Sequence, residues 1–214
     1  MTESRSVRVR LRALAGHRAV WPLLALAVIL IIDGFVAPGF FTIRIVEGRL
    51  FGSLIDILYR AVPPAILALG MAVVIGTKGI DLSVGSVIAV VGATIAWRIH
   101  AGDPHFVILL IALGVGLLCG VWNGFLVAVL DIQPIIATLI LMVSGRGIGL
   151  MINLIYQGTN PSFESPLLQG LSVGHIGLIP TRLILGAAIF AVLWLLIRRT
   201  ALGLFLEAVG GNAA

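Results

Sequence analysis

Six long apolar stretches constrain this chain more than any other feature of its sequence. Each is close to the roughly 20 residues that an α-helix needs to cross about 30 Å of hydrocarbon. With 60% hydrophobic and only 11% charged residues, the chain has more apolar surface than a soluble domain of this size hides from water. We therefore expect an all-α fold, a polytopic transmembrane helical bundle. The predicted spans are approximately 21–37, 61–77, 82–99, 106–130, 134–155 and 181–197.

Basic residues lie mostly at the ends of these stretches, as the orientation rule for membrane proteins requires. With the N-terminus in the cytoplasm, six crossings place eight Lys and Arg residues inside and five outside. Both termini are therefore expected in the cytoplasm of a bacterial cell, with the spans in its inner membrane. The inner set is Arg5, Arg8, Arg10, Arg12, Arg18, Lys78, Arg198 and Arg199, and the outer set is Arg44, Arg49, Arg60, Arg98 and Arg182.

This arrangement divides the chain into a basic cytoplasmic segment (1–19), a membrane domain (20–199) and a final cytoplasmic segment (200–214). The first span could be read as a signal peptide, but residues 33–38 contain no small-x-small cleavage pattern, which favours an uncleaved helix. We expect residues 38–60 to form an external helix at the interface. The Gly-, Ser-, Asn- and Pro-rich residues 156–180 are expected to form the longest external loop.

Several spans carry small residues at four-residue spacing. In lipid, such faces let helix backbones approach closely and so contribute much of the packing energy. Four such faces predict a tightly packed bundle rather than independent anchors. They comprise Ala61, Ala65, Ala68, Ala72 and Gly76; Gly85, Ala89 and Ala93; Gly116, Gly120 and Gly124; and Gly145 and Gly149.

A polar break separates the second span from the third, in the sequence Gly-Ile-Asp-Leu-Ser-Val-Gly-Ser (79–86). We expect Gly79 to break one helix and Asp81 to cap the next by accepting from the amides of Ser83 or Val84. The break also fits a transport path, because irregular backbone at membrane depth is tolerated only beside protein or water. Both interpretations can hold, and Asp81 and Ser83 are candidate path residues.

Three further polar residues lie near or within the spans. Asn123 is expected to hydrogen-bond between helices, with substrate contact as the alternative. Gln133, a further candidate path residue, precedes Pro134, a residue typical of a helix start. Arg146 lies deep in the fifth span, where its charge costs at least about 2.5–3.5 kcal/mol unless it faces protein or water. Pairing inside the protein and contact with a polar substrate both remain open for Arg146.

Enzymatic and nucleic-acid functions are not favoured. The four histidines fall in loops or flanks, so no serine–histidine pair or His-rich metal cluster is expected at depth. Cys119 is expected to be a small buried hydrophobe, and the sequence has no phosphate-binding loop of the Walker type. The basic residues are not gathered on one element with aromatics between them, which argues against nucleic-acid binding. We expect neither metal nor cofactor, and ATP, if used, must bind another chain.

Three motifs together resemble the monosaccharide permeases of bacterial ABC importers, the family that includes ribose, arabinose, xylose and galactofuranose permeases. The motifs are Gly-Ile-Asp-Leu-Ser-Val-Gly-Ser (79–86), Gly-Val-Trp-Asn-Gly (120–124), and Gln-Pro-Ile-Ile-Ala-Thr-Leu (133–139) leading to Gly-Arg-Gly (145–147). Residues 50–58 and 200–210 look most similar to the galactofuranose-type permease. The resemblance extends over nearly the whole chain after about residue 20.

The resemblance implies a pair of permease chains, a periplasmic sugar-binding protein and a cytoplasmic ATPase that hydrolyses the ATP. It places ATPase coupling on the segment after residue 200, with Gly203, Glu207, Gly210 and Asn212 as candidate residues. Permeases of this family have roughly ten spans, so the chain is expected to be a shortened permease. Two alternatives remain: a channel or secondary transporter that needs no ATPase, and an inactive fragment. The sugar carried is not specified by these motifs.

Overall fold

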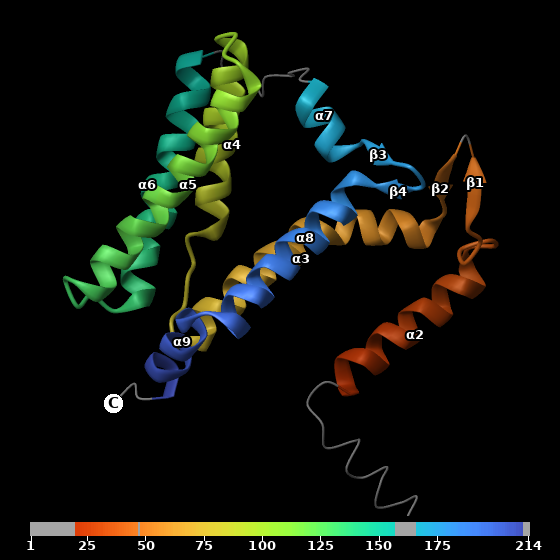
Figure 1. The fold of residues 1–214 in the computed structure, drawn as a ribbon, viewed down its shortest axis with the longest axis horizontal. Coiled ribbons are helices and arrows are strands. Elements are labelled where there is room, and N and C mark those ends of the chain that lie inside the picture. The colour runs from red at the N-terminus through yellow and green to blue at the C-terminus, as the bar shows by residue number, and fades with distance from the viewer. Residues whose placement is uncertain (1–19, 47, 157–165, 212–214) are drawn as a thin grey trace, which may run out of the picture. The chain divides into compact units, whose positions relative to one another are not determined.

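The computed structural model describes residues 20–46, 48–156 and 166–211 (Figure 1). They form two compact units, Met1–Leu58 and Tyr59–Ala214. The helices are α2 (Val20–Val36), α3 (Ser53–Gly76), α4 (Val84–His100), α5 (His105–Ala128), α6 (Pro134–Tyr156), α7 (Pro166–Ser172), α8 (Thr181–Arg199) and α9 (Ala201–Gly211). The strands are β1 (Arg44–Val46), β2 (Arg49–Phe51), β3 (His175–Ile176) and β4 (Ile179–Pro180).

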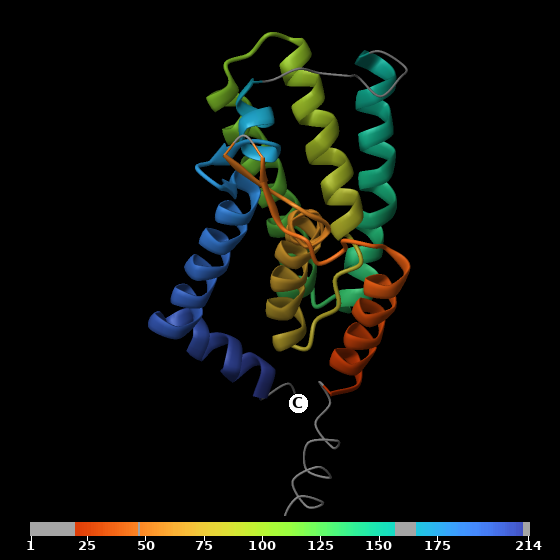
Figure 2. The same ribbon diagram turned by 90° about the vertical axis from the view of Figure 1, so that its right-hand side faces the viewer.

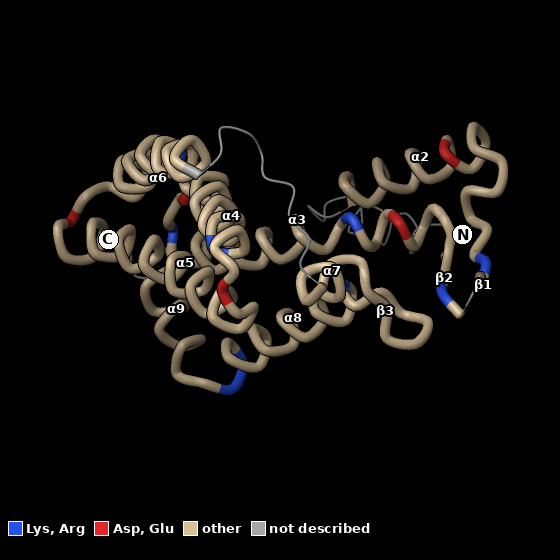
Figure 3. Tube along the Cα trace, turned by 90° about the horizontal axis from the view of Figure 1, so that it is seen from above, with Lys and Arg blue, Asp and Glu red and all other residues tan. Residues whose placement is uncertain are grey.

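The expected all-α, polytopic membrane fold is confirmed. Helices α3, α5, α6 and α8 are long and apolar enough to cross a membrane. Helices α2 and α4 contain 17 residues each, which is at the short end of the range that spans a bilayer. No Asp, Glu, Lys or Arg lies in α5, and Arg146 is the one such residue in α6 (Figure 3).

Of the expected interfacial helix over residues 38–60, residues 38–46 and 48–52 are not helical, and residues 53–60 are the first part of α3. Strands β1 and β2 pair antiparallel with Arg44 opposite Phe51, because Thr and β-branched residues before the turn favour strands. Gly52 then accepts the first helical hydrogen bond of α3, from the Asp56 amide at 3.0 Å. Its φ is +154°, and a Cβ there would lie 2.6 Å from the Thr42 carbonyl oxygen, so only glycine fits this corner.

Helix α3 therefore begins eight residues before the span predicted from the sequence, and it runs on through Pro63 and Pro64. Prolines inside a membrane helix are tolerated where neighbouring groups satisfy the freed backbone carbonyls. The apolar pattern predicted only the part of α3 from residue 61 onward, because the first two turns contain the charged residues Asp56 and Arg60.

In the second unit, α4 packs against both α5 and α6 and makes its most extensive contact with α6 (Figure 1). The connection from α4 to α5 is closed by an ion pair at 2.5 Å between Arg98 Nε and Asp103 Oδ2. Buried apolar side chains between these helices, including Val90, Ile108 and Leu141, form the core of the unit.

The predicted long loop 156–180 contains regular structure, although residues 157–165 lie outside the described part. Helix α7 is followed by the β3–β4 hairpin, which leads directly into α8. The Tyr59 hydroxyl on α3 donates to the Ser172 carbonyl at the end of α7, and the Arg182 guanidinium lies 4.1 Å from the centre of the Tyr59 ring. These contacts attach α7 to the beginnings of α3 and α8.

Candidate functional site

The connection between α3 and α4 begins with a Schellman motif. The Lys78 amide donates to the Ile75 carbonyl at 2.9 Å, and the Gly79 amide donates to the Val74 carbonyl at 3.0 Å. The residue in the left-handed conformation is Lys78, with φ of 59°, and not Gly79. The expectation that Gly79 breaks the helix is therefore wrong by one position, although glycine is the usual residue at this turn.

Asp81 then organises the start of α4. Its Oδ1 atom accepts from the Ser83 amide at 2.7 Å and from the Ser83 hydroxyl at 2.6 Å, so the predicted bond from the Ser83 amide is present. The Asn123 side-chain amide on α5 donates to the same Ser83 hydroxyl at 2.9 Å. Asp81, Ser83 and Asn123, which are far apart in sequence, thus form one hydrogen-bonded group that we call the polar cluster.

Two hydroxyl groups that the sequence did not single out extend this region to α6. The Ser86 hydroxyl lies 2.7 Å from the Ser83 carbonyl oxygen and 3.1 Å from that of Leu141. The Thr138 hydroxyl lies 3.3 Å from the Ile80 carbonyl oxygen. A usable signal was present, since Ser86 stands one residue beyond Gly85 in the first motif and Thr138 lies in the third.

Burial separates the roles of the cluster residues. Ser83 and Ser86 are 0% exposed, so in this structure they join α4, α5 and α6 and face no open path. Asp81 and Asn123 are half-buried. The Asn123 Oδ1 atom is buried and has no hydrogen-bond partner among the described residues, so this acceptor of the polar cluster is unsatisfied there.

Gln133 and Arg146 do not join the polar cluster. Gln133 is exposed just before α6, where its carbonyl accepts from the Ile136 and Ala137 amides. Arg146 is exposed on α6, and no charged or hydrogen-bonding partner lies near it within the described ranges. Of its two open interpretations, internal pairing finds no support in this part of the chain.

The glycines singled out for packing differ in their surroundings. A Cβ at Gly145 would lie 3.1 Å from Ser86 Oγ, and one at Gly149 would lie 3.3 Å from the Ala89 carbonyl carbon, so α6 packs against α4 along this face. A Cβ at Gly116 would reach Val91 at 3.9 Å. No described atom lies within 4 Å of a Cβ at the remaining positions Gly76, Gly85, Gly120 and Gly124.

Helix α9 contains three of the four candidate coupling residues. Figure 2 shows α9 turning away from the end of α8. Gly203 is buried, and a Cβ there would overlap the Ile197 carbonyl oxygen. Gly210 meets the Gly76 carbonyl oxygen in the same way. Glu207 is exposed, and Asn212 lies outside the described residues.

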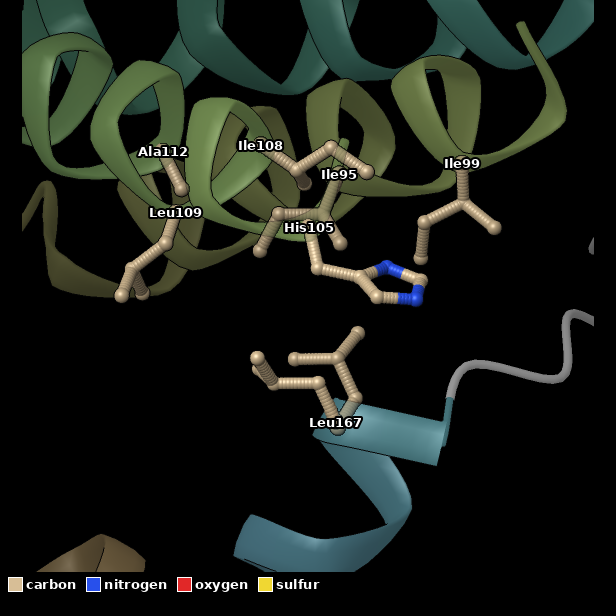
Figure 4. A pocket seen from close by; sticks show the side chains of 8 residues that line it. Ile95, Ile99, His105, Ile108, Leu109, Ala112 and Leu167 are labelled. Carbon is tan, nitrogen blue, oxygen red and sulfur yellow. The ribbon is translucent and has the colours of Figure 1, made fainter. Parts of the chain in front are cut away.

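A small apolar cavity of about 20 Å³ lies where α7 meets the far ends of α4 and α5. Leu167 of α7 points toward the His105 ring and Leu109 on α5, and Ile95 and Ile99 of α4 line the same space (Figure 4). The described residues contain no group of His, Cys, Asp or Glu side chains suited to a metal ion. The apolar side chains around this cavity pack α7 against these helix ends.

Shortening Leu167 to alanine is expected to loosen α7. Loss of a buried leucine side chain typically costs about 2–5 kcal/mol in a well-packed core, and less here because Leu167 is 38% exposed. Amide hydrogen exchange in residues 166–172 should speed up at least fivefold. Leu178→Ala on the adjacent hairpin is the control, and equal exchange rates in the two variants would contradict this role for Leu167.

Similarity to known proteins identifies the class of this chain. The family described as branched-chain amino acid transport system / permease component matches residues 53–214. The chain belongs to this permease family. The matched region begins with α3 and includes both the polar cluster and α9.

Relatives of the permease include proteins named for sugar import. It is 51% identical to the galactofuranose transporter permease protein YtfT of Escherichia coli K12, covering 92% of this chain and 58% of the relative. It is 37% identical to the fructose import permease protein FruF of Bifidobacterium longum (94% and 57%). It is 33% identical to the ribose import permease protein RbsC of Haemophilus influenzae (89% and 57%). No solved structure gives a significant match.

The motif resemblance to monosaccharide permeases is thus confirmed, and the permease is a multi-pass inner-membrane protein. It spans somewhat less than three fifths of the length of these curated relatives.

Proposed function

We propose that this permease forms part of the translocation pathway of an ATP-driven monosaccharide importer. The observation that carries the proposal is the family match over residues 53–214, a region that includes α9 just after the basic pair Arg198 and Arg199. Galactofuranose or a galactose-like sugar is the first substrate to test, since the galactofuranose permease is 51% identical.

The partners follow from this assignment. A second permease chain completes the pathway, a periplasmic binding protein delivers the sugar, and a cytoplasmic ATPase supplies the energy. The N-terminus and residues 200–214 face the cytoplasm, and residues 20–199 form the membrane domain. Two contacts support this arrangement. Helix α9 meets the end of α3, and α7 meets the end of α4 and the start of α5. Each pair lies on one side of the membrane in the predicted topology.

The permease itself makes and breaks no covalent bond. Its path needs few polar contacts with the sugar, because a transported molecule must leave as readily as it enters. Asp81 and Asn123, which are half-buried, and Gln133 and Arg146, which are exposed, remain our candidates for contact. Ser83 supports the first two from within the polar cluster.

Sugar uptake in reconstituted vesicles tests the proposal. The permease, co-purified with its ATPase and second permease chain, is inserted into vesicles and given the binding protein and radiolabelled galactose or galactofuranose. ATP on the ATPase side should increase uptake at least tenfold. Uptake that survives ATP removal but collapses with the ion gradient would indicate a secondary transporter. No uptake with every partner present would indicate an inactive fragment.

Reversing the charge of Glu207 is expected to weaken the hold on the ATPase. Glu207 is exposed on α9, and a charge of the wrong sign at a contact between proteins costs affinity. Glu207→Arg should reduce the ATPase retained on the purified permease at least tenfold, measured by quantitative immunoblot. Glu207→Gln is the matched control. Full retention by Glu207→Arg would place the docking surface elsewhere.

A further inference from the structure

Helix α9 touches α3 through the backbone of two glycines. A Cβ placed on Gly210 would overlap the carbonyl oxygen of Gly76 and would lie 3.3 Å from its carbonyl carbon and 4.0 Å from the Cα of Thr77. Gly76 is the last residue of α3. The end of α9 therefore lies directly on the end of α3, an arrangement visible in both ribbon views (Figures 1 and 2).

One turn earlier in α9, the two helices are separated. A cavity of about 280 Å³ lies there, and it is lined by Leu206 of α9, by Leu69 and Val73 of α3 and by Phe190 and Trp194 of α8, among others. The cavity lining is almost entirely apolar. Beyond the cavity, the backbones of α9 and α3 come into close contact at Gly210 and Gly76.

The other end of α9 is held to α8. The Thr200 hydroxyl lies 2.5 Å from the Leu196 carbonyl oxygen and 3.3 Å from the Leu202 amide. Gly203 lies against the Ile197 carbonyl, where a side chain would overlap it. Both glycines thus face the protein's own backbone, and they are unsuited to gripping a partner. The exposed Glu207, between them, remains available for that role.

Gly76 leads directly into the α3–α4 connection and the polar cluster. The Thr77 hydroxyl donates to the Val74 carbonyl at 2.8 Å, and the Schellman bonds fix Lys78 and Gly79 onto the same turn of α3. Asp81 follows two residues later, bonded to Ser83 at the start of α4. Hydrogen bonds therefore hold both ends of this connection, its first residues to α3 and Asp81 to Ser83 at the start of α4.

We propose that the contact between Gly210 and Gly76 is the point at which α9 acts on residues 77–83, so that Gly210 is a positioning residue for the start of α4. This inference rests on the proposed function, in which α9 receives the movement of the ATPase. It assigns Gly210 to transmission within the permease and leaves partner docking to Glu207.

Three alanine variants separate this contact from general effects on the helix. Gly210→Ala places a methyl group on the Gly76 carbonyl, whereas no described atom lies within 4 Å of a Cβ at Gly211 or at Gly76 itself. All three changes raise helix propensity by similar amounts, at most about 1 kcal/mol near helix ends. Only Gly210→Ala is therefore expected to move α9 away from α3.

The measurement is the labelling rate of a cysteine at Lys78, an exposed residue of the connection, in a Cys119→Ser background. A water-soluble maleimide should label the Gly210→Ala protein at least threefold faster or slower than the parent. Gly211→Ala and Gly76→Ala should label at the parent rate. Equal rates in all four proteins would overturn the linkage, whether or not the permease transports sugar.

A second measurement keeps the test decisive if Gly210→Ala fails to fold. Cysteines at Leu206 and Val73, across the cavity, should be joined by a short bifunctional thiol reagent in an otherwise unchanged permease without Cys119. Failure to join them would show that α9 does not lie on α3 and would overturn the inference. In the reconstituted importer, Gly210→Ala should retain the ATPase but reduce ATP-driven uptake at least tenfold, and Gly211→Ala should not. If Gly210→Ala changes the labelling rate as expected but the parent permease shows no uptake, the proposed function is refuted and the inference about Gly210 stands.

Discussion

A leucine at Gly149 is expected to separate α4 from α6 and to lower the free energy of unfolding by about 3 kcal/mol, at the upper end of typical overpacking costs. A Cβ at this buried position already lies 3.3 Å and 3.4 Å from the carbonyl carbon and oxygen of Ala89, and a leucine adds three more carbons. Close backbone approach is a main source of packing energy between membrane helices, so a side chain that separates the two backbones removes much of the stability of this interface.

Gly147→Leu is the matched control, because Gly147 lies on the same helix and no described atom is within 4 Å of a Cβ there. Unfolding is followed by the loss of helical circular dichroism as sodium dodecyl sulfate is added to detergent micelles. Similar midpoints for Gly149→Leu and Gly147→Leu would show that α4 and α6 do not pack along this face.

The second large effect is expected from Ser83→Ala. The change removes the hydroxyl that joins Asp81 to Asn123, and it leaves the side-chain amide of the half-buried Asn123 without its partner on α4. An unsatisfied buried polar group costs about 1–3 kcal/mol, whereas hydrogen bonds between membrane helices average about 0.6 kcal/mol. We expect a loss of about 1–2 kcal/mol, because two bonds are broken at a fully buried site.

Thr94→Val removes another buried hydroxyl and is the control, since the Thr94 hydroxyl donates only within α4, to the Val90 carbonyl at 2.8 Å. Its loss should cost less than about 0.5 kcal/mol. Combining Ser83→Ala with Asn123→Leu should recover part of the loss, because the second change removes the unsatisfied group. Strictly additive losses would indicate that the two side chains do not interact.

The positions of the membrane helices were predictable from the sequence because hydropathy in lipid depends on local composition. Five of the predicted spans match helices to within a few residues, namely α2, α4, α5, α6 and α8. The prediction failed where a local backbone feature decided the outcome, as at Gly52, which turns a hairpin into α3, and at Lys78, which takes the left-handed position beside an available glycine.

The candidate site was predictable in part. Asp81, Ser83 and Asn123 stand out as polar residues in apolar surroundings, and the bond from the Ser83 amide to Asp81 spans only two residues of sequence. Their union with Asn123, 40 residues from Ser83, depends on which faces of α4 and α5 meet. The spacing of residues in one sequence does not reveal which helix faces meet. For the same reason, the sequence analysis did not single out Ser86 and Thr138.

By itself, the sequence determined that this protein lies in a lipid membrane, where its spans approximately begin and end, and to which family it belongs. Each of these depends on the order and type of neighbouring residues. Only the tertiary structure decided which small residues support packing, which polar side chains share hydrogen bonds, and that Gly210 rests on Gly76. These outcomes depend on the rotation and depth of each helix against the others. Such rotations are set by many weak contacts acting together, and no short motif records their sum.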